Sequence, residues 1–423
     1  MKNILTSIAA LFICLGLVAQ ENKRTILYGA TAHLGNGELI QSSVVIFEEG
    51  KLTAVADASS IRITKEGANY YDLTGKHVYP GLILPNTSLG LTEIDAVRAT
   101  RDLNEVGSFT PNVRSIIAYN TDSKVVATVK SNGVLLAQIC PEGGTLPGRS
   151  SIVELQAWNW EDAAYLMDEG QHLYWPSKLT WQWGEGWKAD DKYLEKQDEL
   201  RSFLSAAKAY AANKNNAEKD LKFESLRGIF DGTETLYLHA NFATDIEQSI
   251  LYAKDLGIKK VVLVGGHGAA KVPEILKKYD IPVILNRIHS LPRQADDPVD
   301  YPYTLPKKLW DLGITFCLDY DGSMERMGSR NLPFLAGTAA AYGLDKEQAL
   351  QLITLNAAKI LGIDAFVGSL EAGKDATLVI SEGDLLDMKE SIVMKAFIRG
   401  NEVDLSNHQT ELWQKYLKKY GLE

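Results

Sequence analysis

The sequence predicts an α/β protein in which a (β/α)₈ TIM barrel carries a small β-sandwich domain formed from both chain ends. Two observations predict this fold. Between residues 80 and 365, short apolar runs alternate with helical patterns, as expected of parallel strands covered by helices. Short strands and turns flank this region on both sides, and neither flank can bury both of its faces alone.

The N-terminus has the pattern of an export signal. Lys2 is followed by an apolar run over residues 4–18, which is shorter than the ~20 residues needed to span a bilayer. Cleavage near Gln20 would leave a protein without a membrane span, so residues 1–20 are predicted to be a signal peptide and the location to be periplasmic. A lipid anchor at Cys14 is the alternative, although bulky residues precede this cysteine.

Charge and cysteine usage limit the partners. Lys and Arg number 44 against 54 Asp and Glu, a formal net charge of −10 with no basic tract. Such a chain is a poor match for nucleic acid or an anionic membrane, so a small molecule is the expected partner. Cys140 and Cys317 lie on apolar, strand-like segments, which favours buried free thiols over a disulfide and does not match the spacing of a metal cluster.

The predicted sandwich combines residues 21–79 with residues 366–405. Between them, residues 80–365 contain seven apolar runs of strand length, and an eighth strand is expected near residues 173–175. The seven runs cover residues 82–86, 134–139, 152–156, 235–239, 261–265, 282–286 and 314–319.

Helices are expected over residues 190–213, 245–256, 331–342 and 346–361, with Asp245 and Asp345 as N-caps. The C-terminal segment, residues 406–423, is predicted to form one more helix. It places Leu412, Trp413 and Tyr416 on one face, which we expect to dock on the body of the protein or on a second subunit.

Four segments carry a family resemblance: GNGELIQSSVVIFEEGKLTAV, PGLI before the first barrel strand, EQALQLITLNAAKILGI and VGSLEAGKDATLVI. Together they resemble an exported branch of the amidohydrolase superfamily related to imidazolonepropionases. The resemblance implies the barrel, the sandwich, a possible homo-oligomer, and hydrolysis of a C–N bond in a cyclic amide or similar small molecule. It also implies a divalent metal ion that lowers the pKa of bound water toward ~7.

In that family two histidines end strand one, strands five and six give one histidine each, and strand eight gives an aspartate. Here Asn86 and Ser88 occupy the strand-one positions, so the metal site is degenerate. A carboxamide or hydroxyl is a poor ligand for Zn²⁺. The resemblance leaves His239 at strand five, His267 just beyond strand six, and Asp319 or Asp321 at strand eight.

These residues give the predicted site. His239, His267 and Asp319 would hold at most one ion, Zn, Fe or Mn, or none. Catalysis is assigned to Asp319, Asp321 and His239, while Asn86 and Ser88 orient the substrate. Alternatively, His239 is a hydrogen-bonded histidine at the barrel rim, and the two aspartates cap a helix or pair with Arg326.

Further binding residues follow other strands. Six of the eight tryptophans lie between residues 158 and 187, in the region after strand three. We expect Trp158, Trp160, Trp181 and Trp183 over the barrel mouth, either as a substrate surface or as an apolar lid. After strand seven, Arg287 is predicted to bind substrate and, together with Arg293 and His289, either clamps a carboxylate or lies on a solvated loop.

The sequence therefore predicts a hydrolase acting on a non-peptide C–N bond with at most one metal ion. The alternative from another class is a catalytically inactive, metal-free homologue that binds a small molecule or a glycan. A third hypothesis is metal-free hydrolysis with Asp321 as base or Ser88 as nucleophile near His239, although no nucleophile-elbow motif supports a serine nucleophile.

Overall fold

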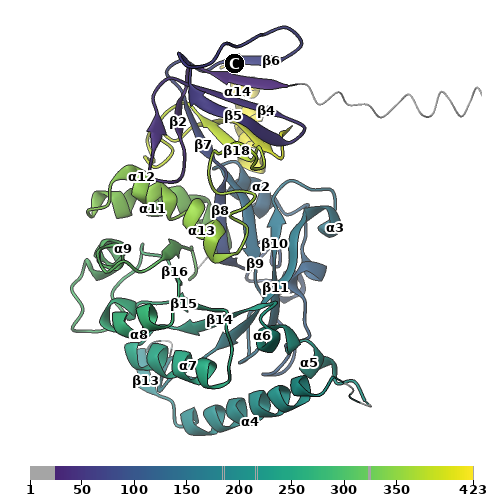
Figure 1. Ribbon diagram of the computed structural model, residues 1–423, viewed down its shortest axis with the longest axis vertical. Helices are drawn as coiled ribbons and strands as arrows, with labels where there is room; N and C mark the ends of the chain where they lie inside the picture. The colour runs from purple at the N-terminus through teal and green to yellow at the C-terminus, as the bar shows by residue number, and fades with distance from the viewer. Residues whose placement is uncertain are drawn as a thin grey trace, which may run out of the picture.

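A computed structural model describes residues 24–182, 184, 186–214, 216, 218–322 and 325–422. Two sheets built from both chain ends lie at one end of the molecule, the barrel forms the middle, and α4 lies at the opposite end (Figure 1). The predicted signal peptide and Trp183 fall outside the described residues. Within the described ranges, every helix is too short or too polar to cross a membrane.

Strands from both chain ends share one of the two terminal sheets, in which β7 pairs antiparallel with β18, whereas the other sheet consists of N-terminal strands. One sheet has the order β5-β4-β1-β6 and the other β20-β19-β18-β7-β2-β3. A buried apolar cluster joins them, with Leu27 and Phe47 from the first sheet and Leu378 and Phe397 from the second. The strand bounds are β1 Thr25–Tyr28, β2 Thr31–His33, β3 Leu39–Ile40, β4 Ser43–Glu48, β5 Lys51–Asp57, β6 Asn69–Asp72, β7 His77–Pro80, β18 Leu378–Ser381, β19 Val393–Ile398 and β20 Asn401–Glu402.

The barrel is an eight-stranded, nearly closed sheet, and each of the seven apolar runs assigned to it from the sequence overlaps one of its strands. The strand order is β17-β16-β15-β14-β11-β10-β9-β8. The bounds are β8 Leu82–Thr87, β9 Val134–Ile139, β10 Gly148–Glu154, β11 Ala164–Tyr174, β14 Thr235–Ala240, β15 Val261–Gly265, β16 Val283–Leu285 and β17 Phe316–Leu318. The strand expected near residues 173–175 is the end of β11.

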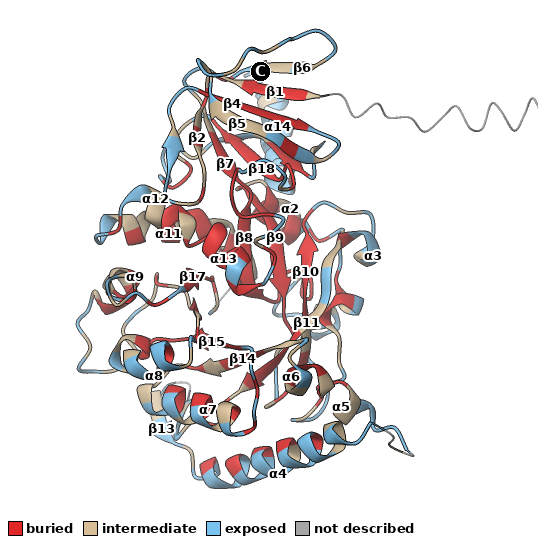
Figure 2. Cartoon of the chain, viewed as in Figure 1, coloured by how far each residue is buried: buried red, intermediate tan, exposed pale blue. Residues whose placement is uncertain are grey.

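The barrel interior is packed and mostly apolar toward its amino-terminal end. Inward side chains such as Ile83, Leu136, Tyr237 and Cys317 form one buried cluster, which α13 extends. Figure 2 shows the same concentration of buried residues along β8, β9 and β10. Cys140 and Cys317 are free and buried, as predicted.

The expectation of parallel barrel strands throughout is wrong at β10, which runs antiparallel to both neighbours. Residues 140–147 connect β9 to β10 as a tight hairpin, with Gly143 and Gly144 in the left-handed backbone region. A parallel crossover needs about a dozen residues or more, and this connection is too short for one. The hairpin therefore lies at the carboxyl ends of the parallel strands, which we call the mouth.

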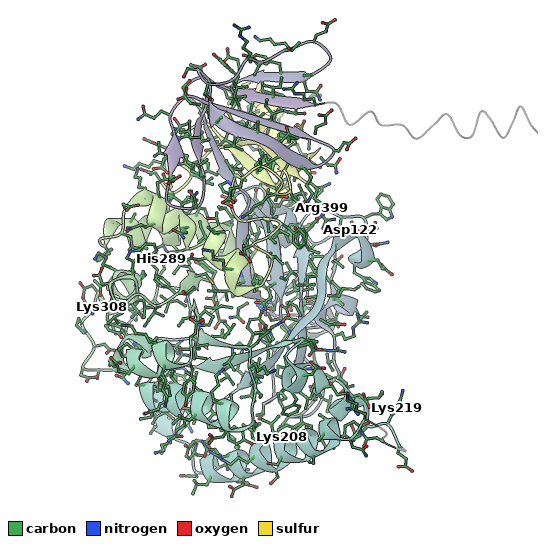
Figure 3. The ribbon with its side chains drawn as sticks, viewed as in Figure 1. Asp122, Lys208, Lys219, His289, Lys308 and Arg399 are labelled. Carbon is green, nitrogen blue, oxygen red and sulfur yellow. The ribbon has the colours of Figure 1, made fainter. Side chains whose placement is uncertain are left out.

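The far end of β10 faces the terminal sheets instead. Arg399, in the turn after β19, places its Nε 2.8 Å from Glu154 Oε1 at the end of β10. The same guanidinium, which Figure 3 labels at Arg399, lies 4.6 Å from the ring centroid of Tyr165, at the start of β11. Residues 155–163 therefore belong to the end of the barrel opposite the mouth.

The seam between β8 and β17 is bridged by other backbone. Ile83 N donates to Ile353 O at 3.0 Å, and Leu318 N donates to Leu352 O at 3.3 Å. This use of the backbone interrupts the helix predicted over residues 346–361, which forms α12 Lys346–Gln351 and α13 Leu355–Ile360. Asp345 caps α12 in a capping box, as predicted.

The remaining helices cover the barrel. Asp245 does not cap α7 as expected, because it lies buried in the first turn and Phe242 is the N-cap residue. The bounds of the remaining α-helices are α2 Lys124–Lys130, α3 Trp160–Ala163, α4 Tyr193–Ala212, α5 Leu221–Glu224, α6 Arg227–Asp231, α7 Ala243–Asp255, α8 Pro273–Lys278, α9 Tyr301–Asp311, α10 Glu325–Gly328, α11 Leu332–Ala341 and α14 His408–Tyr420. Strands β12 Leu179–Gln182 and β13 Gly186–Ala189 form a separate two-stranded sheet.

The apolar face of α14 does not dock on the body of the protein as expected. Trp413 is 58% exposed, and Leu412 and Tyr416 are exposed as well. Among the described residues, the side-chain hydrogen bonds that attach this helix to α2 lie at its start. Asn407 Nδ2 donates to Ser131 Oγ, at the end of α2, at 3.0 Å, and Thr128 Oγ1 donates to Gln409 Oε1 at 3.1 Å.

Truncation after Asn407 should therefore cost little stability. The removed side chains bury little apolar surface, so we expect a loss of about 1 kcal/mol or less in the free energy of unfolding. Phe397→Ala, a matched change in the buried cluster of the terminal sheets, should cost about 3–5 kcal/mol. Urea unfolding measures both, and a truncation as damaging as Phe397→Ala would contradict the exposed placement of α14.

Candidate functional site

Asn86 closes the mouth end of the seam. It is the penultimate residue of β8 and lies in the left-handed region, with φ 48°, where the register between β8 and β9 shifts. Asn is among the few non-glycine residues that adopt this conformation readily. Its Nδ2 donates to Asp319 Oδ2 at 2.8 Å, and its backbone N donates to Gln138 Oε1 at 3.0 Å. The carboxamide is therefore committed to holding the strand-eight aspartate.

Ser88 is committed in a similar way. Its Oγ donates to Glu325 Oε2 at 3.0 Å, and Thr87 Oγ1 donates to Glu325 Oε1. Glu325 starts α10 and is buried, and burial raises its pKa to about 7 against the lowering effect of the bond from Thr87. The sequence interpretation missed Glu325; the signal that could have found it is a lone acid four residues after Asp321.

The two strand-eight aspartates have different surroundings, which the sequence left open. Asp319 is completely buried against Asn86, and its Oδ1 accepts from Asp321 N at 3.0 Å. Asp321 Oδ2 accepts from Asn286 Nδ2 at 2.9 Å. Burial raises the pKa of both carboxyls, and Asp321 raises that of Asp319 further, while Glu142 raises that of Asp321.

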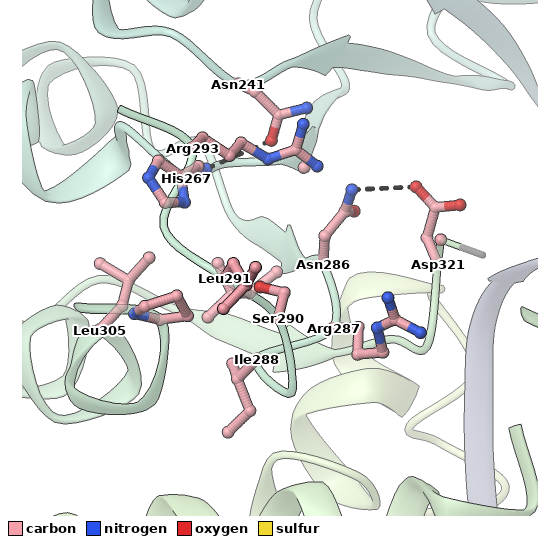
Figure 4. Close-up of a pocket in the computed structure, with 14 residues that line it drawn as sticks. Asn241, His267, Asn286, Arg287, Ile288, Ser290, Leu291, Arg293, Leu305 and Asp321 are labelled. Atoms are coloured by element: carbon pink, nitrogen blue, oxygen red, sulfur yellow. Dashed lines mark hydrogen bonds between the residues drawn. The ribbon is translucent and has the colours of Figure 1, made fainter. Parts of the chain in front are cut away.

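Two cavities meet at Asp321. One, of about 310 Å³, lies at the ends of β8, β9 and β11 and is lined by Asn86, Ser88, Tyr174 and Glu325 among others. The other, of about 120 Å³, lies beyond β15 and β16. Figure 4 shows the smaller cavity with Asp321 at one side, bonded to Asn286. Asp321 is thus the carboxyl that lines both spaces.

The predicted metal ligands are not brought together. His239 Nε2 lies 2.8 Å from His172 Nδ1, and its ring stacks on Tyr174 with centroids 3.9 Å apart. Burial lowers the pKa of His239 to about 3, so the imidazole is neutral. His267 Nε2 instead lies 2.8 Å from Asp297 Oδ2. Among the described residues, no group of three or more His, Cys, Asp or Glu is arranged to hold an ion.

Trp158 and Trp160 are not at the mouth, contrary to expectation. Because β10 runs antiparallel, the loop that follows it lies at the amino-terminal end of the barrel, where Trp158 is 87% exposed and Trp160 starts α3. Trp181 does follow a strand that ends at the mouth. It packs edge-on against Trp187 but is 59% exposed and lines neither mouth cavity.

The arginines after β16 lie at the mouth. Arg287 and Arg293 both line the smaller cavity, and Arg287 also lies 5.3 Å from the ring centroid of Tyr320. His289 faces elsewhere, with Nε2 2.7 Å from Thr338 Oγ1 of α11. Arg326 pairs with Asp95 at 2.8 Å, so the alternative that it pairs with a strand-eight aspartate is wrong.

Comparison with known proteins relates the chain to amidohydrolases. Residues 241–404 match the sequence model of the amidohydrolase family. An imidazolonepropionase from Fusobacterium nucleatum is 24% identical over 382 residues, which cover 83% of this chain and 87% of the relative. The chain is thus similar to amidohydrolases over residues 241–404 and, at low identity, to an imidazolonepropionase over most of its length.

Two further amidohydrolase relatives extend the comparison. Amidohydrolase tasK from Hapsidospora irregularis is 22% identical over 375 residues, which cover 81% of this chain but only 38% of tasK. The solved structure of an amidohydrolase from Thermotoga maritima aligns with a TM-score of 0.78 at 24% identity, covering 90% of this chain and 99% of that one. This structural likeness supports the fold.

Members of the superfamily commonly bind a divalent metal. One solved structure, an adenosine deaminase from Xanthomonas campestris, contains zinc; it aligns with a TM-score of 0.52 at 14% identity, covering 93% of this chain and 98% of that one. The residues here do not fit such an ion. Asn86 uses its Nδ2 to hold Asp319, and the carboxamide oxygen that remains is a poor ligand for Zn²⁺ compared with an imidazole nitrogen. Ser88 is committed to Glu325, and His239 and His267 have separate partners.

The chain should therefore retain no stoichiometric Zn²⁺, Mn²⁺ or Fe²⁺ after incubation with each ion and desalting, because the donor groups do not converge. Elemental analysis measures the retained metal. Close to one equivalent, lost in both His239→Ala and Asp319→Asn, would contradict this geometry.

Stability should fall as pH rises through the pKa of Glu325. This pKa is about 7 in the folded chain, above the ordinary 4.5, so the folded state binds more protons between these values. The stabilisation that proton binding to Glu325 gives the folded state is complete below about pH 4.5 and lost above about pH 7. Glu325→Gln should remove roughly 3 kcal/mol of this pH-dependent loss in urea unfolding. Glu382→Gln, at an exposed side chain, is the control, and an unchanged slope in Glu325→Gln would contradict the expectation.

Proposed function

We propose that this protein hydrolyses a C–N bond other than a peptide bond, in a cyclic amide or similar small molecule, with Asp321 as general base. The observation that carries the proposal is the position of Asp321, which lines both mouth cavities while Asn286 holds its carboxyl. Because His239, His267 and Asp319 do not converge, the proposal uses no metal ion. Homology to amidohydrolases supports the reaction class.

Asp321 takes a proton from water as the water oxygen bonds to the carbonyl carbon. The same carboxyl then returns the proton to the nitrogen as the C–N bond breaks, which gives a carboxylic acid and an amine. Tyr174 lines the larger cavity, and burial raises the pKa of its phenol well above the usual value. It therefore remains protonated and is positioned as a donor to the carbonyl oxygen.

Asp319 acts as a positioning residue. Its Oδ1 accepts from the backbone N of Asp321, and Asn86 holds its Oδ2. The pair is therefore fixed from both sides of the seam. Asn86 and Ser88 would shape the cavity wall in this scheme, with their polar groups already committed to Asp319 and Glu325. Export, a periplasmic location and a homo-oligomeric state stay predictions.

Asp321→Asn should lower kcat/KM by roughly 10²–10⁴ on any amide that the protein hydrolyses. A panel of hydantoins, dihydropyrimidines, imidazolones and N-acyl amines, followed by NMR for the released acid and amine, identifies a substrate first. Asp311→Asn, at an exposed aspartate, is the isosteric control. Full activity of Asp321→Asn would refute the assignment, whereas binding without hydrolysis across the panel would favour the inactive binding protein.

The pH dependence of kcat/KM provides a separate prediction. Asp321 must be ionised to act as base, and burial raises its pKa. The acidic limb of the profile should therefore lie clearly above the usual aspartate range of about 4. A limb at the ordinary value would contradict the role of this buried carboxyl.

A further inference from the structure

A further cavity lies at the end of the barrel opposite the mouth. Its volume is about 670 Å³, larger than either mouth cavity, and it lies where β14, β15 and β16 begin and α13 ends. A space of this size is typical of sites that bind small molecules. Its described lining includes none of the residues assigned to the mouth, so the proposed hydrolysis gives it no role.

The first half of β11 forms one wall of this cavity because β11 extends beyond its neighbour β14. β11 pairs with β14 from Gly170 onward, whereas its earlier residues pair with β10. Asp168, with φ 52°, lies between the two halves. Leu166 and Met167 line the cavity and are 40% and 50% exposed. Proteins usually cover large apolar side chains at a strand edge, so these two favour an occupant with an apolar part.

Other apolar residues extend this wall. Val262 of β15 and Leu361, at the end of α13, line the cavity and belong to the buried cluster inside the barrel. Pro282, just before β16, lines it as well. An aliphatic chain in this space would therefore exchange water for apolar contacts, which is favourable in proportion to the area removed from water.

Carboxyl groups also line the cavity, but two of them are paired with arginines. Arg114 Nε lies 2.7 Å from Asp168 Oδ2, and Arg149 Nη1 lies 3.5 Å from Glu234 Oε1. Burial raises the pKa of Glu234 to about 7, against the lowering effect of Arg149. These two side chains therefore add little net negative charge to the cavity.

Glu169, a third carboxyl in the lining, is held from within the barrel. Gln138 Nε2 donates to its Oε1 at 2.7 Å, and Ser150 Oγ lies 2.8 Å and 2.9 Å from its two oxygens. Burial raises the pKa of Glu169 to about 8, although the bonds from Gln138 and Ser150 lower it. At neutral pH this side chain is therefore mostly uncharged.

The exposed charges of the lining are mainly positive. Lys259, Lys260 and Lys359 are exposed there, and Asp280 is the exposed acid. Asp231, outside the lining, is attracted to Lys260 and partly offsets it. With the other carboxyls paired or mostly protonated, the lysines outnumber Asp280. A cluster of like charge beside a cavity raises the local concentration of small ions of the opposite sign.

We propose that this cavity binds a small amphiphilic anion, such as a medium-chain carboxylate, with its charged group at Lys259 and Lys359 and its aliphatic part against Leu166, Met167 and Leu361. The apolar walls and the exposed lysines account for the two parts of such a ligand. The site is separate from the mouth, so the proposal does not rest on the proposed function.

The test compares probes that share a tail or share a charge. Calorimetry on the full chain measures binding of decanoate, decylammonium and octanoate, each below its micellar concentration. We expect decanoate to bind about tenfold more tightly than decylammonium, because the lysines attract one and repel the other. Octanoate should bind more weakly than decanoate by about fourfold for each missing CH₂ group.

Variants locate the site. The double variant Lys259→Gln, Lys359→Gln should weaken decanoate binding about fivefold. Leu166→Asn should weaken it as well and reduce the difference between decanoate and octanoate. Two controls should leave decanoate binding unchanged: Lys208→Gln, at an exposed lysine of α4 that Figure 3 labels, and Arg287→Gln, at the smaller mouth cavity.

Failure of either probe comparison would overturn the proposal. No binding of decanoate, or decylammonium bound as tightly as decanoate, would refute the preference for an anion. Equal affinities of octanoate and decanoate would refute the apolar contact. A loss of decanoate binding in Arg287→Gln, with none in the lysine variant, would assign the anion to the mouth instead. If Leu166→Asn does not fold, the two probe comparisons on the unmodified chain still decide.

Discussion

The mouth of the barrel depends on the hydrogen bond from Asn86 to Asp319. Asn86 lies next to last in β8 and Asp319 directly follows β17, the two strands that do not pair with each other, and the bond joins the two side chains at 2.8 Å in a buried setting. A buried hydrogen bond contributes about 1 kcal/mol net, and an unpaired buried carboxyl is costly. With Asp319 held inside the wall, Asp321 is left as the carboxyl that faces both cavities.

This bond also explains why the mouth does not fit a metal ion. An imidazole at residue 86 would offer a strong nitrogen ligand to a cation, whereas the carboxamide uses its N–H group to hold Asp319 and has only a weakly binding oxygen left. Glu325 extends the same pattern, because its carboxyl accepts from Thr87 and Ser88. The residues of β8 therefore bind the carboxyls that follow β17 directly.

The antiparallel β10 redistributes the loops around the barrel. The hairpin before it contributes Glu142, Gly143 and Gly144 to the larger mouth cavity. The loop after it lies near the terminal sheets, where Glu154 meets Arg399. Trp158 and Trp181, which follow β10 and β11, consequently lie at opposite ends of the barrel. Trp158 is at the end near the terminal sheets, and Trp181 is at the end that carries the mouth.

The sequence was sufficient for the barrel strands because each is a short apolar run, and a run of that kind needs no knowledge of its partners. The sequence could not predict the direction of a strand, since the apolar pattern of β10 is the same for a parallel or an antiparallel strand. The positions of His239, Asp319 and Asp321 at strand ends were predicted, but their partners were not. The bonds of His239 to His172 and of Ser88 to Glu325 join residues far apart in the chain, so local pattern carries no signal for them.

A double-mutant cycle on Asn86 and Asp319 tests most directly whether their bond holds the mouth together. Asn86→Gly removes the carboxamide at a backbone conformation that glycine adopts readily, and Asp319→Ala removes the carboxyl. Urea unfolding of the two single variants and the double variant gives their coupling energy. We predict a coupling of about 1 kcal/mol. Additive losses, with a coupling near zero, would contradict the account.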